Sequence, residues 1–224
     1  AGIWVHDKEY LIAVDRICKE HGAFLICDEV ATGFGKTGAL FASELAGIEP
    51  DIMIVGKGLS AGYLPISAAI TTEKIFEGFS GEPSEYKTFF FGQTYAGNPL
   101  AAAVSIANLD LFEKNKSMEL AKENMAYFAE LIEKEILSLK NVFEIRRQGF
   151  MTAIELTQNP GNFSPYDANE RIGIKITKEA RSRSAIIRPL GNAMVLMPAL
   201  AMPKDKLEQL VQIAKESIEA VCGK

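Results

Sequence analysis

The sequence predicts an α/β protein, because short apolar runs alternate with stretches of helical periodicity through its first half. Strands are expected at 23–27 and 51–55, where apolar runs end abruptly in charged or glycine residues. A continuous apolar run is typical of a strand that is buried on both faces of a parallel sheet. We therefore expect these strands to be parallel neighbours covered by helices.

The remaining elements follow from the same periodicities. Apolar residues at helical spacing predict a helix over 7–21, which Gly22 ends, and Pro99 suits the first turn of another helix. We expect residues 1–116 to form part of a larger domain, 117–140 a connecting helix and 141–224 a smaller α/β domain. The other predicted elements are a strand at 65–71, helices at 98–112, 117–139, 171–183 and from 204, and strands near 142–146, 150–156, 186–188 and 194–196.

The composition is that of an ordinary globular protein. The 224 residues carry a formal net charge of −5 and are 48% hydrophobic, an ordinary globular balance that gives no electrostatic reason for nucleic acid or an anionic membrane as partner. No apolar run reaches the roughly 18 residues that a membrane span requires. Three cysteines without C-x-x-C spacing and only two histidines predict reduced thiols, no metal centre and a cytoplasmic location.

A glycine-rich segment, residues 33–38, matches the pattern G-x-G-x-x-G of dinucleotide-binding folds. That motif requires its glycines directly after a strand and an acidic residue about 20 positions later, whereas here Asp51 comes too early. A P-loop would require a glycine at Val30. The context favours a flexible glycine-rich loop over either nucleotide site.

Two charged residues stand at the ends of the first two predicted strands. Asp28 ends one strand, and Lys57 follows the next between two glycines. Open α/β sheets bind ligands at this edge. Lys57 could form a Schiff base while Asp28 pairs with a protonated pyridine nitrogen. An ordinary Asp–Lys ion pair is the commoner arrangement, and spacing alone favours it.

The sequences of several segments decide between these interpretations, because they closely resemble segments of class III pyridoxal-phosphate-dependent aminotransferases. The matching segments occur in the expected order and extend through the whole chain. They are LICDEVATGFGKTG at 25–38, PDI at 50–52, GKGL at 56–59, GYLPI at 62–66 and GQTYAGNPLA at 92–101.

The resemblance implies the fold of type I pyridoxal-phosphate enzymes, with part of a large mixed, mostly parallel sheet and a small C-terminal α/β domain. It implies that Lys57 forms the Schiff base with the cofactor and that Asp28 keeps the ring nitrogen protonated. By the same resemblance, Val30 packs under the ring and Thr94 donates its hydroxyl to the phosphate of the neighbouring subunit's cofactor. The last role implies a homodimer with shared sites.

Two details resemble the branch of the family that serves biotin synthesis. Ala31 stands where many relatives carry glutamine, and Arg188, within IRPLGN, matches an arginine that holds the substrate carboxylate. A surface ion pair is the alternative role for Arg188. Another class III aminotransferase, acting on ornithine, 4-aminobutyrate or a related ω-amine, is the alternative activity. The amino donor, S-adenosylmethionine or another amine such as lysine, stays open.

The chain is shorter than members of this family, and the resemblance covers their C-terminal part. The resemblance implies that Ala1 falls in the middle of the cofactor-binding domain, and the lack of an initiator Met agrees with this expectation. The segments that would anchor the phosphate and stack on the cofactor are missing from the sequence. A non-catalytic fragment that binds no cofactor is therefore the third alternative.

Overall fold

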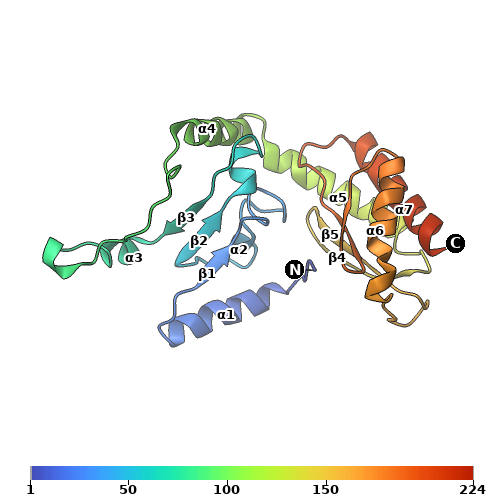
Figure 1. Cartoon of the computed structure of the whole chain (residues 1–224), viewed down its shortest axis with the longest axis horizontal. Helices are drawn as coiled ribbons and strands as arrows, with labels where there is room; N and C mark the ends of the chain where they lie inside the picture. The colour runs from blue at the N-terminus through green and yellow to red at the C-terminus, as the bar shows by residue number, and fades with distance from the viewer. Residues whose placement is uncertain (1, 224) are drawn as a thin grey trace. The chain divides into compact units, whose positions relative to one another are not determined.

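The computed structural model describes residues 2–223, and by their contacts these residues form two compact units (Figure 1). The expected domain boundaries after residues 116 and 140 stay predictions. The N-terminal unit comprises 6–35 and 39–117; the C-terminal unit comprises 2–5, 36–38 and 118–223.

The N-terminal unit is built on a mixed three-stranded sheet in the order β1-β2-β3. The first two strands are parallel, as predicted, and β3 is antiparallel to β2. Its elements are α1 (Lys8–Glu20), β1 (Ile26–Asp28), α2 (Ala42–Leu45), β2 (Ile52–Val55), the short 3₁₀ helix η1 (Lys57–Ser60), β3 (Ala68–Thr71), α3 (Glu73–Glu77), η2 (Pro83–Glu85) and α4 (Pro99–Lys114).

The expected burial on both faces is wrong for β1, and within β2 only Val55 is buried while the other residues are partly buried. Ile26 in β1 is 57% exposed, β3 is exposed throughout, and α1 contains no buried residue. The first strand is also shorter than predicted: it begins at Ile26, and residues 23–25 lie outside it. An apolar run indicates what a strand can bury, whereas its actual cover depends on elements that are distant in the sequence.

The C-terminal unit contains a four-stranded antiparallel sheet in the order β4-β5-β7-β6. No helix in the described part of the chain is long and apolar enough to cross a membrane. The elements of this unit are α5 (Ser117–Glu135), β4 (Val142–Gln148), β5 (Met151–Leu156), η3 (Ala168–Glu170), α6 (Ile172–Ser182), β6 (Arg188–Leu190), β7 (Ala193–Leu196) and α7 (Lys204–Cys222).

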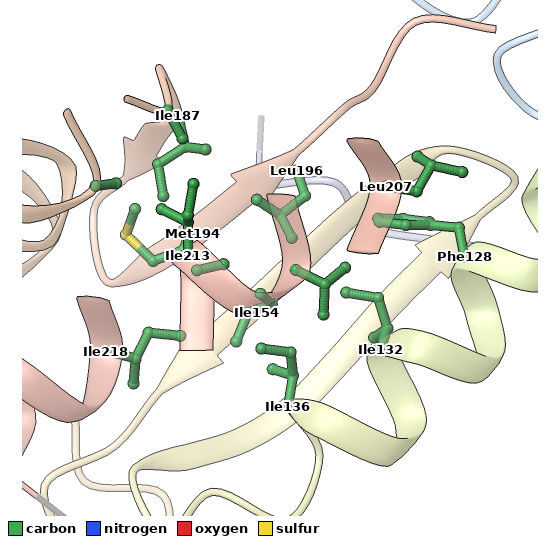
Figure 2. Packing of buried hydrophobic residues seen from close by; sticks show 14 of the residues in the cluster. Phe128, Ile132, Ile136, Ile154, Ile187, Met194, Leu196, Leu207, Ile213 and Ile218 are labelled. Atoms are coloured by element: carbon green, nitrogen blue, oxygen red, sulfur yellow. The ribbon is translucent and has the colours of Figure 1, made fainter. Parts of the chain in front are cut away.

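Helices α5, α6 and α7 and the sheet of the C-terminal unit bury one hydrophobic core. Figure 2 shows Phe128 and Ile132 of α5, and Ile136 directly after it, pointing toward residues of the sheet and of α7. The strand residues Ile154 and Leu196 are almost fully buried within it. Burial of such side chains stabilises a fold by roughly 1.5–3 kcal/mol each relative to exposure. This unit therefore has the packed core that the exposed sheet of the N-terminal unit lacks.

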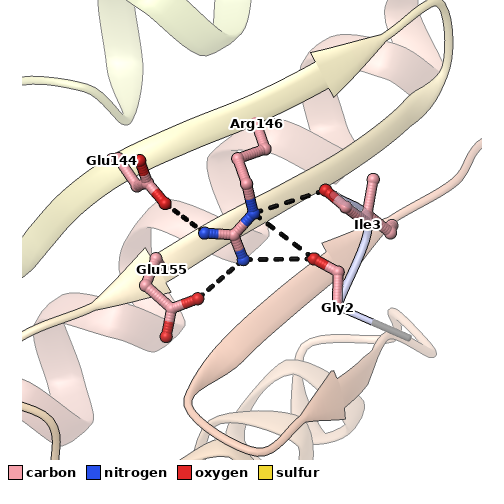
Figure 3. Close-up of polar contacts among 5 residues, drawn as sticks. All are labelled: Gly2, Ile3, Glu144, Arg146 and Glu155. Carbon is pink, nitrogen blue, oxygen red and sulfur yellow. Dashed lines mark hydrogen bonds and ion pairs between the residues drawn. The ribbon is translucent and has the colours of Figure 1, made fainter. Parts of the chain in front are cut away.

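An arginine on β4 fastens the first described residues to this sheet (Figure 3). The guanidinium of Arg146 donates to Oε2 of Glu155 at 2.7 Å, to Glu144, and to the backbone carbonyls of Gly2 and Ile3 at 3.1–3.3 Å. Burial lowers the pKa of Arg146, but its bonds to Glu155 and Glu144 outweigh that effect and raise the pKa overall. The guanidinium of Arg146 thus links two glutamates of the sheet to the backbone of residues 2–3.

Candidate active site

Asp28 is the last residue of β1, at the edge of the sheet where the parallel strands end. Its Oδ1 accepts a hydrogen bond of 3.0 Å from the backbone N–H of Val30, which orients the carboxylate within its own turn. The side chain is exposed, and the preceding Cys27 is half-buried, so burial raises the pKa of that thiol. The carboxylate is therefore oriented and accessible.

Lys57 lies at the same edge as Asp28. β1 and β2 are parallel with Asp28 opposite Ile54, and Lys57 follows β2 directly after Gly56. The lysine side chain is exposed, and its backbone has a positive φ of 40°, which is uncommon for a residue other than glycine. No ion pair joins Asp28 and Lys57 among the described residues, so the interpretation as a simple salt bridge finds no support here.

An asparagine of α4 holds the turn that carries the lysine. Asn108 donates through Nδ2 to the carbonyl oxygens of Gly58 at 2.9 Å and Leu59 at 3.1 Å. These carbonyls belong to η1, whose short length leaves few internal bonds to fix its shape. Asn108 was not among the predicted site residues, because a single polar residue on a helix carries no signal of its partner.

Val30 is the third residue that the structure brings to this edge. A Cβ atom added at Gly56 would lie 3.5 Å from Cγ1 of Val30, in ordinary van der Waals contact. The valine side chain therefore lies against the backbone that leads into Lys57. Asp28, Val30 and Lys57 form one site at the ends of β1 and β2, and we call it the β1–β2 edge site.

A buried glutamate, Glu29, is hydrogen-bonded to the residues around the β1–β2 edge site. Glu29 is only 2% exposed and accepts hydrogen bonds from the backbone N–H of Ser43 at 2.8 Å and from the hydroxyl of Thr32. Its backbone N–H donates to the carbonyl of Ile54 on β2. A buried carboxylate requires such partners, because desolvation strongly disfavours an unpaired charge. Glu29 thus ties the end of β1 to β2 and to α2.

The second half of the glycine-rich loop, residues 36–38, belongs to the C-terminal unit. Nζ of Lys36 donates to the carbonyl of Pro198 at 2.8 Å, and the backbone N–H of Phe150 donates to the carbonyl of Lys36 at 2.9 Å. Nε2 of Gln148 donates to the carbonyl of Thr37 at 2.8 Å. Burial lowers the pKa of Lys36. These groups are used within the fold, which agrees with the preference for a loop over a nucleotide site.

Two further predicted site residues come from other segments of the chain. Thr94 is exposed in an irregular stretch of the N-terminal unit between η2 and α4. Arg188 begins β6 in the C-terminal unit, is exposed, and pairs in register with Val195. Their roles stay predictions.

The fold agrees with the family that matches this chain. A model of the class-III aminotransferases matches residues 1–218, so the protein belongs to that family. Its relatives include two proteins named adenosylmethionine-8-amino-7-oxononanoate aminotransferase. The one from Nitratidesulfovibrio vulgaris is 43% identical over 99% of this chain and 41% of its own length. The one from Geobacter sulfurreducens is 39% identical over 99% of this chain and 49% of its own length.

Solved structures support the same assignment of the fold. An enzyme of that name from Methanocaldococcus jannaschii matches with a TM-score of 0.94 and 33% identity, over 98% of this chain and 51% of the other. An amine transaminase from an uncultivated Pseudomonas species, solved in its PLP-bound form, matches with a TM-score of 0.91 and 30% identity, over 98% and 50%. The chain therefore spans about half the length of the relatives it matches.

Proposed function

We propose that this protein takes part in pyridoxal-phosphate-dependent transamination, with the β1–β2 edge site as its reacting centre. The observation that carries the proposal is the shared sheet edge of Asp28 and Lys57, with Val30 beside the lysine backbone. A primary amine, a carboxylate and an aliphatic side chain suit a flat, protonated pyridine ring. Glycines on both sides of Lys57 present no side chain to obstruct such a ring.

Each residue then has a chemical role. The cofactor, when bound, withdraws electrons from the amino-bearing carbon of a substrate. Asp28 holds the proton on the ring nitrogen, and its bond from the N–H of Val30 fixes the direction of the carboxylate. Lys57 would hold the cofactor through Nζ, and its amine, once freed by an amino donor, would take the proton from the substrate carbon and return it to the cofactor.

For the substrate, we infer amination of 8-amino-7-oxononanoate to 7,8-diaminononanoate in biotin biosynthesis, with Arg188 binding the carboxylate. The names of the relatives from three organisms support this substrate, and they support S-adenosylmethionine as the amino donor. Arg188 is exposed and can reach a ligand, and a guanidinium binds a carboxylate through two parallel hydrogen bonds. The likeness to the solved (S)-enantioselective omega-transaminase from Thermomicrobium roseum, at 28% identity, favours the second candidate, activity on an ω-amine.

We also infer a homodimer in which Thr94 of one subunit contacts the cofactor phosphate of the other. Support comes from the aromatic segment, which we define as residues 86–95. Phe90 and Tyr95 are each more than 80% exposed there, as is Tyr86, whereas contiguous exposed apolar surface is uncommon on monomeric proteins. Aromatic residues are enriched at protein interfaces. A second subunit is the partner that would cover them.

Chemical trapping tests the reacting centre. The protein is mixed with pyridoxal phosphate, reduced with borohydride and digested, and mass spectrometry locates the adduct. We expect it on Lys57 in large excess over Lys74, an exposed lysine of the same unit. Lys57→Ala should remove that adduct and leave the labelling of Lys74 unchanged. A folded sample that labels Lys57 no more than Lys74 would contradict the proposal and favour a non-catalytic fragment.

A further inference from the structure

A buried aromatic side chain in the glycine-rich loop has no role in the chemistry proposed above. Phe34 is 5% exposed, and its ring makes edge-on contacts with Phe41 and Phe112, at centroid distances of 5.6 and 6.4 Å. Its backbone φ is +58°, a left-handed conformation that bulky residues rarely adopt. Such a conformation persists only when the surrounding structure enforces it, and here two flanking aromatic rings do so.

The ring of Phe34 presses on the residue that follows Lys57. A Cβ atom added at Gly58 would lie 2.7 Å from Cβ and 2.9 Å from Cδ2 of Phe34, closer than real atoms approach. Only glycine therefore fits at position 58 while Phe34 keeps its place. This contact connects a loop that follows β1 to a turn that follows β2, across 24 residues of sequence.

Lys57, which directly precedes Gly58, has a strained backbone. Its φ of +40° lies in the left-handed region although the residue is not glycine. Asn108 donates to the carbonyls of Gly58 and Leu59, and Phe34 fills the space that a side chain at position 58 would need. Two separate contacts thus enforce the conformation of the turn, and the direction in which the Lys57 side chain leaves the backbone depends on it.

We propose that Phe34 is a positioning residue for Lys57, acting through its contact with Gly58. The ring keeps η1 in the one conformation in which the lysine amine leaves the sheet edge on the side of Asp28. Loss of the ring allows Lys57 to relax toward ordinary φ values, so the amine samples several directions. This inference rests on the proposed function of Lys57, and its test separates the two.

The first readout needs no cofactor. Hydrogen exchange is measured for the amides of Leu59 and Ala61, which donate to the carbonyls of Gly56 and Gly58 within η1. Phe34→Ala should accelerate their exchange at least tenfold. The control is Ile48→Ala, which removes buried apolar volume elsewhere in the same unit and should change this exchange less than twofold. Equal acceleration in both variants would overturn the proposal.

The second readout is the rate at which pyridoxal phosphate and borohydride label Lys57. We expect a drop of at least tenfold in Phe34→Ala, a drop below threefold in Phe34→Leu, which retains apolar bulk, and no drop in Ile48→Ala. If Phe34→Ala does not fold, Phe34→Leu tests the proposal through the exchange of the same amides, which should be two- to fivefold faster than in the wild type because leucine lacks the ring that contacts Gly58. Failure of wild-type Lys57 to label would contradict the proposed function alone, whereas unchanged exchange in the Phe34 variants would contradict the positioning role alone.

Discussion

Lys57 combines a reactive side chain with a backbone that is difficult to maintain. A residue other than glycine in the left-handed region costs on the order of 1–2 kcal/mol. The bonds from Asn108 and the contact at Gly58 offset that cost. The carboxylate of Asp28 is instead oriented locally, by the hydrogen bond that it accepts from the N–H of Val30. The two reacting groups are therefore held by different means, one long-range and one local.

Arg188 carries the prediction for the substrate. In the holoenzyme, Arg188→Ala should raise the KM for 8-amino-7-oxononanoate about tenfold or more, because a hydrogen bond to a charged group contributes roughly 1.5–3 kcal/mol. The KM for the amino donor should stay unchanged. Arg181→Ala removes an exposed arginine of α6 in the same unit and serves as the control. An unchanged KM for the oxo acid would exclude this role of Arg188.

The sequence predicts these residues unequally, for a physical reason. Asp28 and Lys57 stand at strand ends, and strand ends follow from local apolar patterns. The family resemblance adds Val30, which the structure brings beside them. Phe34 and Asn108 escaped prediction, because their partner Gly58 is 24 and 50 residues away and nothing local marks the contact. Thr94 and Arg188 rest on the resemblance alone.

At the scale of elements, helices and strands lie close to their predicted positions, with ends that differ by a few residues. The helix predicted over 7–21 is observed at Lys8–Glu20, and the strand predicted near 150–156 at Met151–Leu156. Burial was predicted less well, as the exposed strands of the N-terminal unit show. Periodicity depends on neighbouring residues, whereas burial depends on what packs against the element.

The β4–β5 hairpin carries a prediction of its own, at its turn residue Gly149. This glycine has a φ of +59°, and an added Cβ atom would lie 2.5 Å from the carbonyl oxygen of Lys36. Gly191 has a similar φ of +63° in the same unit, with open space around it. Gly191→Ala should lower the free energy of unfolding by about 1 kcal/mol for its backbone alone. Gly149→Ala should lower it by about 1–3 kcal/mol more, because the overlap adds to that cost.

Denaturant titration of the two variants measures the difference. The backbone penalty is common to both glycines, so the extra loss in Gly149→Ala isolates the close approach of the hairpin to residues 36–38. Equal losses in the two variants would mean that the hairpin and this loop segment separate at little cost.

At the scale of the whole molecule, the two units differ in how fully they bury apolar side chains. The aromatic segment, residues 86–95, gives this difference a testable consequence. Phe90→Ser should weaken self-association at least tenfold in sedimentation velocity, because an exposed aromatic at an interface is a common anchor of binding. Ile186→Ser is the matched control, since Ile186 and Phe90 are both 82% exposed. A wild-type protein that stays monomeric, or equal effects of both variants, would exclude this segment as the dimer interface.

Residues 36–38 also have a consequence for the time course of folding. Lys36 bonds to Pro198, 162 residues later, and Thr37 to Gln148, 111 residues later. At roughly 5–20 residues per second, a ribosome completes Pro198 about 8–30 s after Lys36. The nascent loop therefore lacks its hydrogen-bond partners until they are synthesised, and closing so long a stretch of chain is slow. The C-terminal unit therefore completes its fold only when residues 36–38, which are synthesised much earlier, bind to it.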